Sequence, residues 1–267
     1  MRLAVSYDLQ SISEPKILDT PQNYEDGIAI FKKTAGELIG GQKVEAIAGG
    51  IAGPFDEKKR SLVGSPNLKD WIGKPFKQSL EKIFAAPVFI ENDTAMVGLG
   101  EAHFGAGREY KIVAYLTLST GMGGCRIVEG KIDEKTIGFE PGHQIIDADK
   151  TLCPECEGPY LGNYISGKAI FKRTGKKPEE IDDPDFWRRL TVFLAYGLNN
   201  TIVHWSPEVV ILGGSLMNKI EIELVREELS KILKIFPEMP MLKKAELGDI
   251  GGLWGAMVFL KQRLTNA

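Results

Sequence analysis

The chain has 267 residues, 43% of them hydrophobic, which is enough for one large core or, as we expect, for two lobes of ordinary size. Its 33 basic and 36 acidic residues nearly balance, so no nucleic-acid or membrane partner is expected, and a small neutral or anionic ligand suits the composition better. No apolar run reaches the roughly 18 residues of a membrane span, and no basic region with an apolar core opens the sequence, so a cytoplasmic protein is predicted.

The pattern of residues 1–110 predicts a smaller N-terminal α/β lobe. A weakly alternating strand at 2–9 is followed by a polar turn and a partner strand at 14–20. Helices and buried strands then alternate, which is typical of an α/β fold with a largely buried sheet. The predicted elements are a helix over 24–39 ended by Gly40-Gly41, a strand over 44–50, an amphipathic helix over 71–84 and a strand over 88–90.

Residues 111–251 predict a larger second α/β lobe, and a helix over about 252–267 is expected to pack back on the first. An apolar strand at 112–118 runs into the glycine-rich turn Ser119–Gly124, and a second strand follows at 126–128. A buried strand of the parallel type at 209–212 ends in the glycine pair Gly213-Gly214.

The segment Glu91-Asn92-Asp93 comes directly after the apolar strand and before a run of small residues. A carboxylate between a buried strand and a helix start lies where α/β proteins place catalytic groups. Asp93 is therefore the candidate general base. The alternative is that Asn92 or Asp93 only caps the helix, because both residue types are preferred N-caps.

Two glycine-rich segments are candidates for nucleotide binding. Backbone N–H groups around Gly121, Gly123 and Gly124 can surround phosphate oxygens, and the Thr120 hydroxyl adds a donor. Gly213 and Gly214 follow a strand, at the edge of the sheet where nucleotides bind. Both segments could equally be structural turns, because glycines gather in turns without ligands.

The order of these motifs along the chain resembles the ROK family (repressors, open reading frames and kinases). The resemblance covers nearly the whole sequence and depends on several unrelated motifs in one fixed order. These are Gly53-Pro54, Pro66-Asn67-Leu68 with Trp71, Glu91-Asn92-Asp93 with Gly100-Glu101 and Gly105-Ala106-Gly107, Ser119–Gly124, Glu140-Pro141-Gly142-His143, Tyr164-Ile165-Ser166-Gly167, Leu212-Gly213-Gly214, and Leu247-Gly248-Asp249 with Gly255-Ala256.

The resemblance implies a two-lobed actin-like, hexokinase-like ATPase fold with an inter-lobe cleft and the activity of an ATP-dependent hexose kinase. Asp93 would take the proton from the attacking sugar hydroxyl. Phosphoryl transfer needs mostly positioning and charge neutralisation, so a carboxylate within hydrogen-bond reach of the hydroxyl is sufficient as the base. The other hydroxyls would be held by Asn67, Asn92, Glu140 and His143. The turn that contains Thr120 would face the phosphates of ATP, which binds with Mg²⁺, and Gly213-Gly214 would face the adenosine. The resemblance also implies a homodimer.

The three cysteines cannot all pair, and a disulfide framework is not expected. In many members of the family a histidine at the position of His143 and three cysteines hold a structural zinc. Here only Cys153 and Cys156 remain, and a closed zinc site needs four ligands, so Glu155 or Glu157 would have to complete it. The family's sugar-binding glutamate is replaced by Gly162, which predicts altered affinity or specificity.

The family's Asp-x-Gly-Gly-Thr-Lys phosphate loop precedes the segment that matches residues 1–6, and it does not occur in this sequence. The strand that carries this loop lies inside the family's sheet. Without it, two neighbouring strands would have unpaired backbone N–H and C=O groups, and each buried unpaired group destabilises the fold by about 1 to 3 kcal/mol. Three explanations are open: a truncated gene product, a start codon assigned too late, or a sheet that closes differently or through a partner chain. If the loop is truly missing, weak or absent ATP binding is expected. The alternative function is a sugar-binding protein without efficient catalysis, whereas DNA binding, which family repressors perform through an N-terminal helix-turn-helix, is the least expected.

Overall fold

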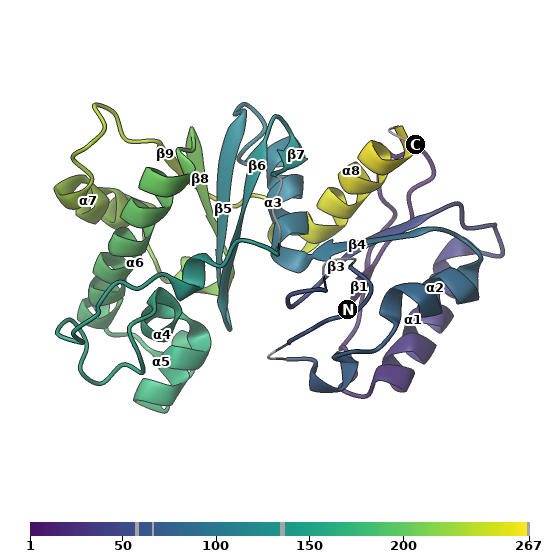
Figure 1. Cartoon of the computed structure of the whole chain (residues 1–267), viewed down its shortest axis with the longest axis horizontal. Helices are drawn as coiled ribbons and strands as arrows, with labels where there is room; N and C mark the ends of the chain where they lie inside the picture. Colours follow the sequence, from purple (N-terminus) through teal and green to yellow (C-terminus); the bar gives the residue numbers. More distant parts are fainter. Residues whose placement is uncertain (57–58, 66, 134–136, 266–267) are drawn as a thin grey trace. The chain divides into compact units, whose positions relative to one another are not determined.

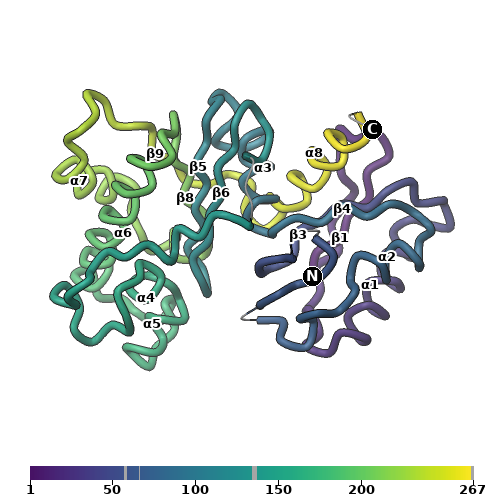
Figure 2. Tube along the Cα trace, in the orientation of Figure 1, coloured from purple at the N-terminus to yellow at the C-terminus, as the bar shows by residue number. Residues whose placement is uncertain are grey.

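The computed structural model describes residues 1–56, 59–65, 67–133 and 137–265, so Pro66 of the predicted motif lies outside the described residues. The chain divides into two compact units. Figure 2 traces the chain, with colours that follow the residue numbers. The first unit contains the described residues of Met1–Phe104, Glu134–Gly138 and Asp249–Ala267, and the second contains those of Gly105–Asp133 and Phe139–Gly248.

The strands described in the first unit form two separate two-stranded sheets. Strand β1 (Arg2–Leu3) pairs antiparallel with β2 (Lys16–Ile17), and β3 (Ile47–Ile51) pairs in parallel with β4 (Val88–Asn92). The predicted pairing of the first two strands is confirmed, but both are far shorter than expected. The reason is local, because the Asp8 carboxylate accepts backbone N–H groups of the next turn and so competes with sheet pairing.

The helices of the first unit begin and end at recognisable signals. Helix α1 (Tyr24–Ile39) has the predicted bounds, because Asn23 caps its first turn and Gly40 ends it in a left-handed conformation. The helix predicted over 71–84 is wrong as a single element. It is a short 3₁₀ helix, η1 (Lys69–Trp71), followed by α2 (Phe76–Phe84), because a residue before proline, here Lys74, avoids helical backbone angles.

Helix α3 (Asp93–Phe104) packs closely against the C-terminal helix α8 (Gly251–Thr265), which follows η5 (Gly248–Ile250). Figure 1 shows α8, in yellow, returning to this unit. A Cβ atom at residue 255 would lie 1.7 Å from the backbone oxygen of Met96, so only glycine permits this approach. The helix that begins at Asp93 is thereby held along its length by the end of the chain.

The second unit is built on one five-stranded sheet in the order β7-β6-β5-β8-β9. Strands β5 (Ile112–Leu118), β8 (Val209–Gly213) and β9 (Met241–Lys244) run parallel, while β6 (Met122–Val128) and β7 (Lys131–Ile132) continue the sheet antiparallel. The β5 prediction is confirmed. Strand β6 begins earlier than predicted, because the glycines at 123 and 124 pair with β5 instead of remaining in the turn.

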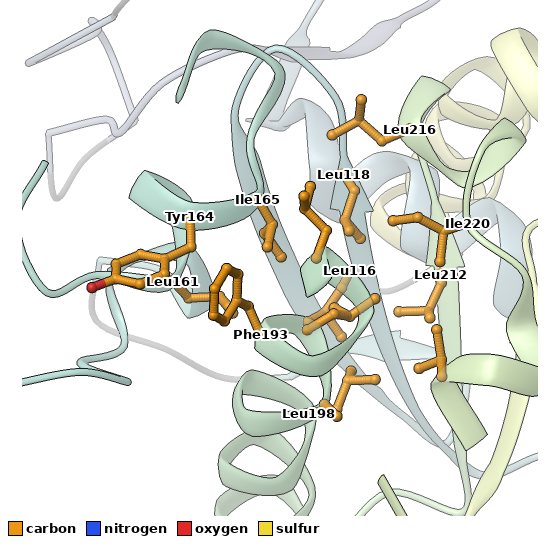
Figure 3. Close-up of a cluster of buried hydrophobic side chains, with 14 of the residues drawn as sticks. Leu116, Leu118, Leu161, Tyr164, Ile165, Phe193, Leu198, Leu212, Leu216 and Ile220 are labelled. Atoms are coloured by element: carbon orange, nitrogen blue, oxygen red, sulfur yellow. The ribbon is translucent and has the colours of Figure 1, made fainter. Parts of the chain in front are cut away.

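A large apolar core joins the sheet of the second unit to its helices (Figure 3). Side chains of β5 and β8 meet those of α4 (Leu161–Ile165) and α6 (Pro184–Trp205), and most of them are fully buried. The other helices are α5 (Gly167–Thr174) and α7 (Ile222–Ile232), with 3₁₀ turns η2 (Pro141–His143), η3 (Pro178–Glu180) and η4 (Ser215–Asn218). None of the helices in the described part of the chain combines the length and apolar content that a membrane crossing requires.

Candidate functional site

Asn92 ends strand β4 and Asp93 begins helix α3, so the predicted catalytic pair lies at a strand-to-helix junction. The Asn92 Oδ1 atom accepts backbone N–H groups of Thr94 at 2.9 Å and Ala95 at 3.3 Å. The Asp93 Oδ1 atom accepts the same Thr94 N–H at 2.8 Å. Asn92 therefore caps the helix, and the Asp93 side chain, which is partly exposed, shares one of the same N–H groups.

The surroundings of Asp93 make it a stronger base than an ordinary aspartate. Burial raises the pKa of its carboxyl group, and the hydrogen bonds from Thr94 offset only part of that increase. Carboxylates with raised pKa values are typical of general bases, because their protonated and ionised forms are closer in free energy near the working pH.

The loop after β3 approaches the same junction. The Asn92 side-chain amide donates a 3.5 Å hydrogen bond to the backbone oxygen of Gly53. Gly53 has a φ of +130°, and a Cβ atom there would lie 2.2 Å from the Gly64 oxygen, so this turn requires glycine. Asn67, on the same loop, is exposed. The first unit thus brings Asn92 and Asp93 together and links them to the loop that carries Asn67.

Glu140 and His143 lie together in the second unit, at the two ends of the 3₁₀ turn η2. The backbone N–H of His143 donates to the Glu140 oxygen at 2.9 Å, and the two side chains approach to 3.5 Å between Nδ1 and Oε2. Both side chains are more than half exposed. A carboxylate beside an imidazole offers an acceptor and a donor for neighbouring hydroxyl groups of a sugar.

The glycine-rich turn and the glycine pair of the second unit meet at the carboxyl ends of the parallel strands β5 and β8. The hydroxyl groups of Ser119 and Ser215, one in each loop, lie 3.4 Å apart. The first residues of helix α5 join them, since the N–H groups of Gly167 and Lys168 donate to the oxygens of Ser119 and Thr120 at 2.8 and 3.0 Å. Two loops and a helix start therefore converge where ligands bind in α/β sheets.

Close packing explains some of the predicted nucleotide-binding glycines. A Cβ atom would lie 2.4 Å from the Tyr115 hydroxyl at Gly213, 2.2 Å from the Leu118 oxygen at Gly214, and 2.6 Å from a Pro141 side-chain carbon at Gly124. Gly121 differs, because a Cβ atom there would meet nothing within 4 Å and its φ is not left-handed. Thr120 and Gly121 are exposed, so this end of the turn is open to a ligand.

Sequence reasoning did not assign roles to Ser119, Ser215 or Lys168, which lie at this convergence. The sequence did contain a signal for Lys168, because Ser166 is a preferred N-cap residue followed by a helical segment. In the structure the Ser166 hydroxyl accepts the backbone N–H of Ala169 at 3.3 Å. The pairing of Ser119 with Ser215 depends on the β5–β8 register, which local sequence does not encode.

The predicted zinc site is not formed in this structure. Cys153 and Cys156 are joined in a disulfide, although no disulfide framework was expected, because a tight turn brings their Cα atoms to 5.3 Å. Glu155 and Glu157, which would have completed the site, pair instead with Arg189 and Lys172. Among the described residues, no group of three or more His, Cys, Asp or Glu side chains is arranged to hold a metal.

Gly162, where the resemblance led us to expect a glutamate, lies against η2. A Cβ atom there would be 3.1 Å from the backbone oxygen of Gly142, next to His143. The glycine therefore permits a close approach between helix α4 and the turn that carries Glu140 and His143.

Comparison with known proteins connects these features. The model of the ROK family matches residues 3–263. A glucokinase of Thermotoga maritima is 28% identical, with 90% of this chain and 86% of that protein covered. A ROK family glucokinase from Streptomyces griseus, solved with glucose and AMPPNP, has a TM-score of 0.79 and 26% identity over 98% and 96% of the two chains. A ROK hexokinase from Thermus thermophilus has a TM-score of 0.85 and 24% identity over 100% and 96%.

These similarities establish the fold class as well. It is the two-lobed α/β fold of actin-like and hexokinase-like ATPases, as the sequence motifs implied.

Proposed function

Because this chain belongs to the ROK family, we propose that it is a sugar kinase that transfers the γ-phosphoryl group of ATP to a hydroxyl group of a hexose or hexose derivative. The observation that carries the proposal is the placement of Asp93. Its carboxylate lies at the β4–α3 junction, is partly exposed, and has a pKa raised by burial. The solved glucokinase with glucose and AMPPNP supports the substrate class.

Asp93 is the proposed general base. It accepts the proton of the attacking hydroxyl as the oxygen of that hydroxyl forms a bond to the γ-phosphorus and the bond to ADP breaks. Asn67, Asn92, Glu140 and His143 are the proposed partners of the remaining sugar hydroxyls, as the family motifs imply. A site that pairs each hydroxyl also discriminates against sugars that lack one.

The nucleotide is proposed to bind at the convergence of the β5–β6 turn, the β8–η4 loop and the start of α5. Thr120 and the N–H group of Gly121 would hold phosphate oxygens, whereas Gly123 and Gly124 belong to strand β6. Gly213 and Gly214 would provide a surface without side chains for adenosine. Mg²⁺ bound with ATP would neutralise phosphate charge.

A second candidate function is sugar binding without efficient ATP use. The observation that favours it is Gly162, because the family's sugar-binding glutamate is absent beside His143. A protein that had lost such contacts would keep some affinity for sugar and lose turnover.

A screen with glucose, fructose, mannose and N-acetylated hexoses tests the two candidates. ADP release is measured with ATP and Mg²⁺, and thermal shifts are measured with each sugar and with the nucleotide alone. Turnover with at least one hexose supports the kinase. A thermal shift with sugar, combined with neither a nucleotide shift nor ADP release, supports the binding protein instead.

A further inference from the structure

The imidazole ring of His143 contacts both a carboxylate and an aromatic ring. Its Nδ1 atom lies 3.5 Å from the Oε2 atom of Glu140, and its centroid lies 5.8 Å from the centroid of the Tyr160 ring, at an interplanar angle of 57°. Tilted ring pairs at about this separation attract each other. In the described part of the chain, the ion pair and the ring contact of His143 come from these two residues alone. The orientation of the imidazole therefore depends on Glu140 and Tyr160.

The backbone that carries His143 is fixed, whereas its side chain is 71% exposed. A Cβ atom at the preceding Gly142 would lie 2.5 Å from the backbone oxygen of Met122, so the turn packs tightly against strand β6. An exposed side chain can occupy several staggered rotamers. Because Nδ1 faces Glu140, the other ring nitrogen, Nε2, is the atom that would bond a sugar hydroxyl. Such a bond requires that one rotamer be selected.

The backbone of Tyr160 is held on both sides of the residue. A β-bridge pairs it with Ile145, and the N–H of the next residue, Leu161, donates to the Gln144 oxygen at 2.8 Å. The Tyr160 oxygen also accepts the N–H of Asn163 at 2.9 Å, at the start of helix α4. A tyrosine side chain has few torsions to fix, so its ring is a rigid surface beside the imidazole.

We propose that Tyr160 is a positioning residue for sugar binding, whose ring limits the rotamers of His143 and holds Nε2 in the orientation that bonds a hydroxyl group. The inference rests on the proposed sugar site and adds to it a residue that acts through His143. Without the ring, sugar binding would have to order a free side chain, and that ordering reduces affinity.

The test measures sugar affinity by calorimetric titration with the hexose that binds best, in variants shown to be folded by their unfolding curves. Tyr160→Ala removes the ring, and Tyr160→Phe keeps it without the hydroxyl. The control is Phe171→Ala, which removes another exposed aromatic ring of the same unit, on helix α5. His143→Ala and the double variant Tyr160→Ala/His143→Ala complete a cycle that measures the coupling between the two side chains.

Proton NMR reports the orientation of His143 without any reaction. The ring current of Tyr160 shifts the imidazole proton resonances, and the chain has three histidines, so the signals lost in His143→Ala identify those of His143. In Tyr160→Ala these resonances should move toward the positions of a free histidine. In Tyr160→Phe and Phe171→Ala they should stay nearly in place.

Tyr160→Ala should weaken sugar affinity roughly threefold to tenfold, which is the cost of ordering one free side chain on binding. Tyr160→Phe should recover most of this loss, and Phe171→Ala should match the unaltered protein. Affinity for ATP should not change in the Tyr160 variants. In the His143→Ala background, Tyr160→Ala should have no further effect, because the ring acts only through the imidazole.

Unchanged His143 resonances in Tyr160→Ala, or an equal loss of affinity with and without His143, would overturn the positioning role and leave the kinase proposal intact. Sugar binding with the expected coupling but without ADP release would overturn the kinase proposal alone. A protein that binds no hexose would overturn both. If Tyr160→Ala does not fold, Tyr160→Leu, which keeps an apolar side chain without a ring, decides by the same two measurements.

Discussion

Gly50, in strand β3, lies directly against Asp93: a Cβ atom at residue 50 would come within 2.7 Å of the Asp93 Cα atom. The parallel register pairs Gly50 with Glu91, so the end of β3 forms one side of the junction that carries the proposed base. The neighbouring Gly49 has open space around it, with nothing within 4 Å of a Cβ atom.

Gly50→Ala should therefore displace the start of α3 and lower kcat, whereas Gly49→Ala should have little effect. The added methyl group meets backbone atoms, which cannot move as a flexible side chain can, and overpacking of this kind costs about 1 to 3 kcal/mol. Kinetics and urea unfolding of the two alanine variants provide the measurement. Equal activities in the two would show that the contact does not position Asp93.

The pKa of Asp93 predicts a stability that depends on pH. Its pKa in the folded state is raised above the ordinary value of 3.8, so ionisation is less favourable in the folded than in the unfolded protein. The resulting penalty is absent below 3.8 and develops as the pH rises through the folded pKa.

Asp93→Asn removes this penalty and still accepts the Thr94 N–H, so it should raise the free energy of unfolding at neutral pH. The gain should shrink as the pH falls toward 3.8. Denaturant unfolding of both proteins across this pH range tests the sign. A variant that is less stable at neutral pH would show that Asp93 is stabilised in its ionised form.

Much of the fold follows from local signals in the sequence. The bounds of α1 depend on Asn23 and Gly40, and those of β5 on a continuous apolar run, so both were predicted correctly. The prediction of one helix over 71–84 was wrong because the helical spacing of its apolar residues was given more weight than Pro75. Strand β6 was predicted too short because its first glycines were assigned to the turn.

The site was predictable only in part, for a similar reason. Asp93 could be placed at a strand-to-helix junction from sequence, because the adjoining segments have clear periodicity. The hydrogen bond from Asn92 to the Gly53 oxygen could not, since it joins positions 39 apart through a loop without regular structure. The requirement for glycine at positions 213 and 214 likewise depends on Tyr115 and Leu118, which only the folded sheet brings near.

Two glycines should separate ligand binding from folding. Gly214 has a φ of +91°, and Gly214→Ala places a methyl group against the Leu118 backbone. This substitution should lower the free energy of unfolding by about 1 to 3 kcal/mol. Gly121→Ala meets no neighbour and should leave stability unchanged, yet weaken ATP binding by crowding the phosphates. Calorimetric titration with ATP and Mg²⁺ checks this, and unaltered affinity in Gly121→Ala would place the phosphates elsewhere.

The state of the cysteines is open to direct measurement. In denaturant without reductant, an alkylating reagent should label Cys125 alone, because Cys153 and Cys156 are bonded to each other. After reduction all three cysteines should react. Zinc added to the unreduced protein should not bind stoichiometrically. Labelling of all three without reductant, or tight zinc binding, would restore the metal site that the sequence suggested.

The role of Asp93 as the base is tested most directly by the activity of Asp93→Asn, measured beside the affinity of this variant for the same hexose. Loss of a general base typically lowers turnover by about 10² to 10⁴-fold, while the amide can still bond a sugar hydroxyl. We expect phosphorylation by Asp93→Asn to fall by about 10²-fold or more, while calorimetric titration still detects sugar binding. Turnover of Asp93→Asn close to that of the unaltered protein would contradict the role of Asp93 as the base.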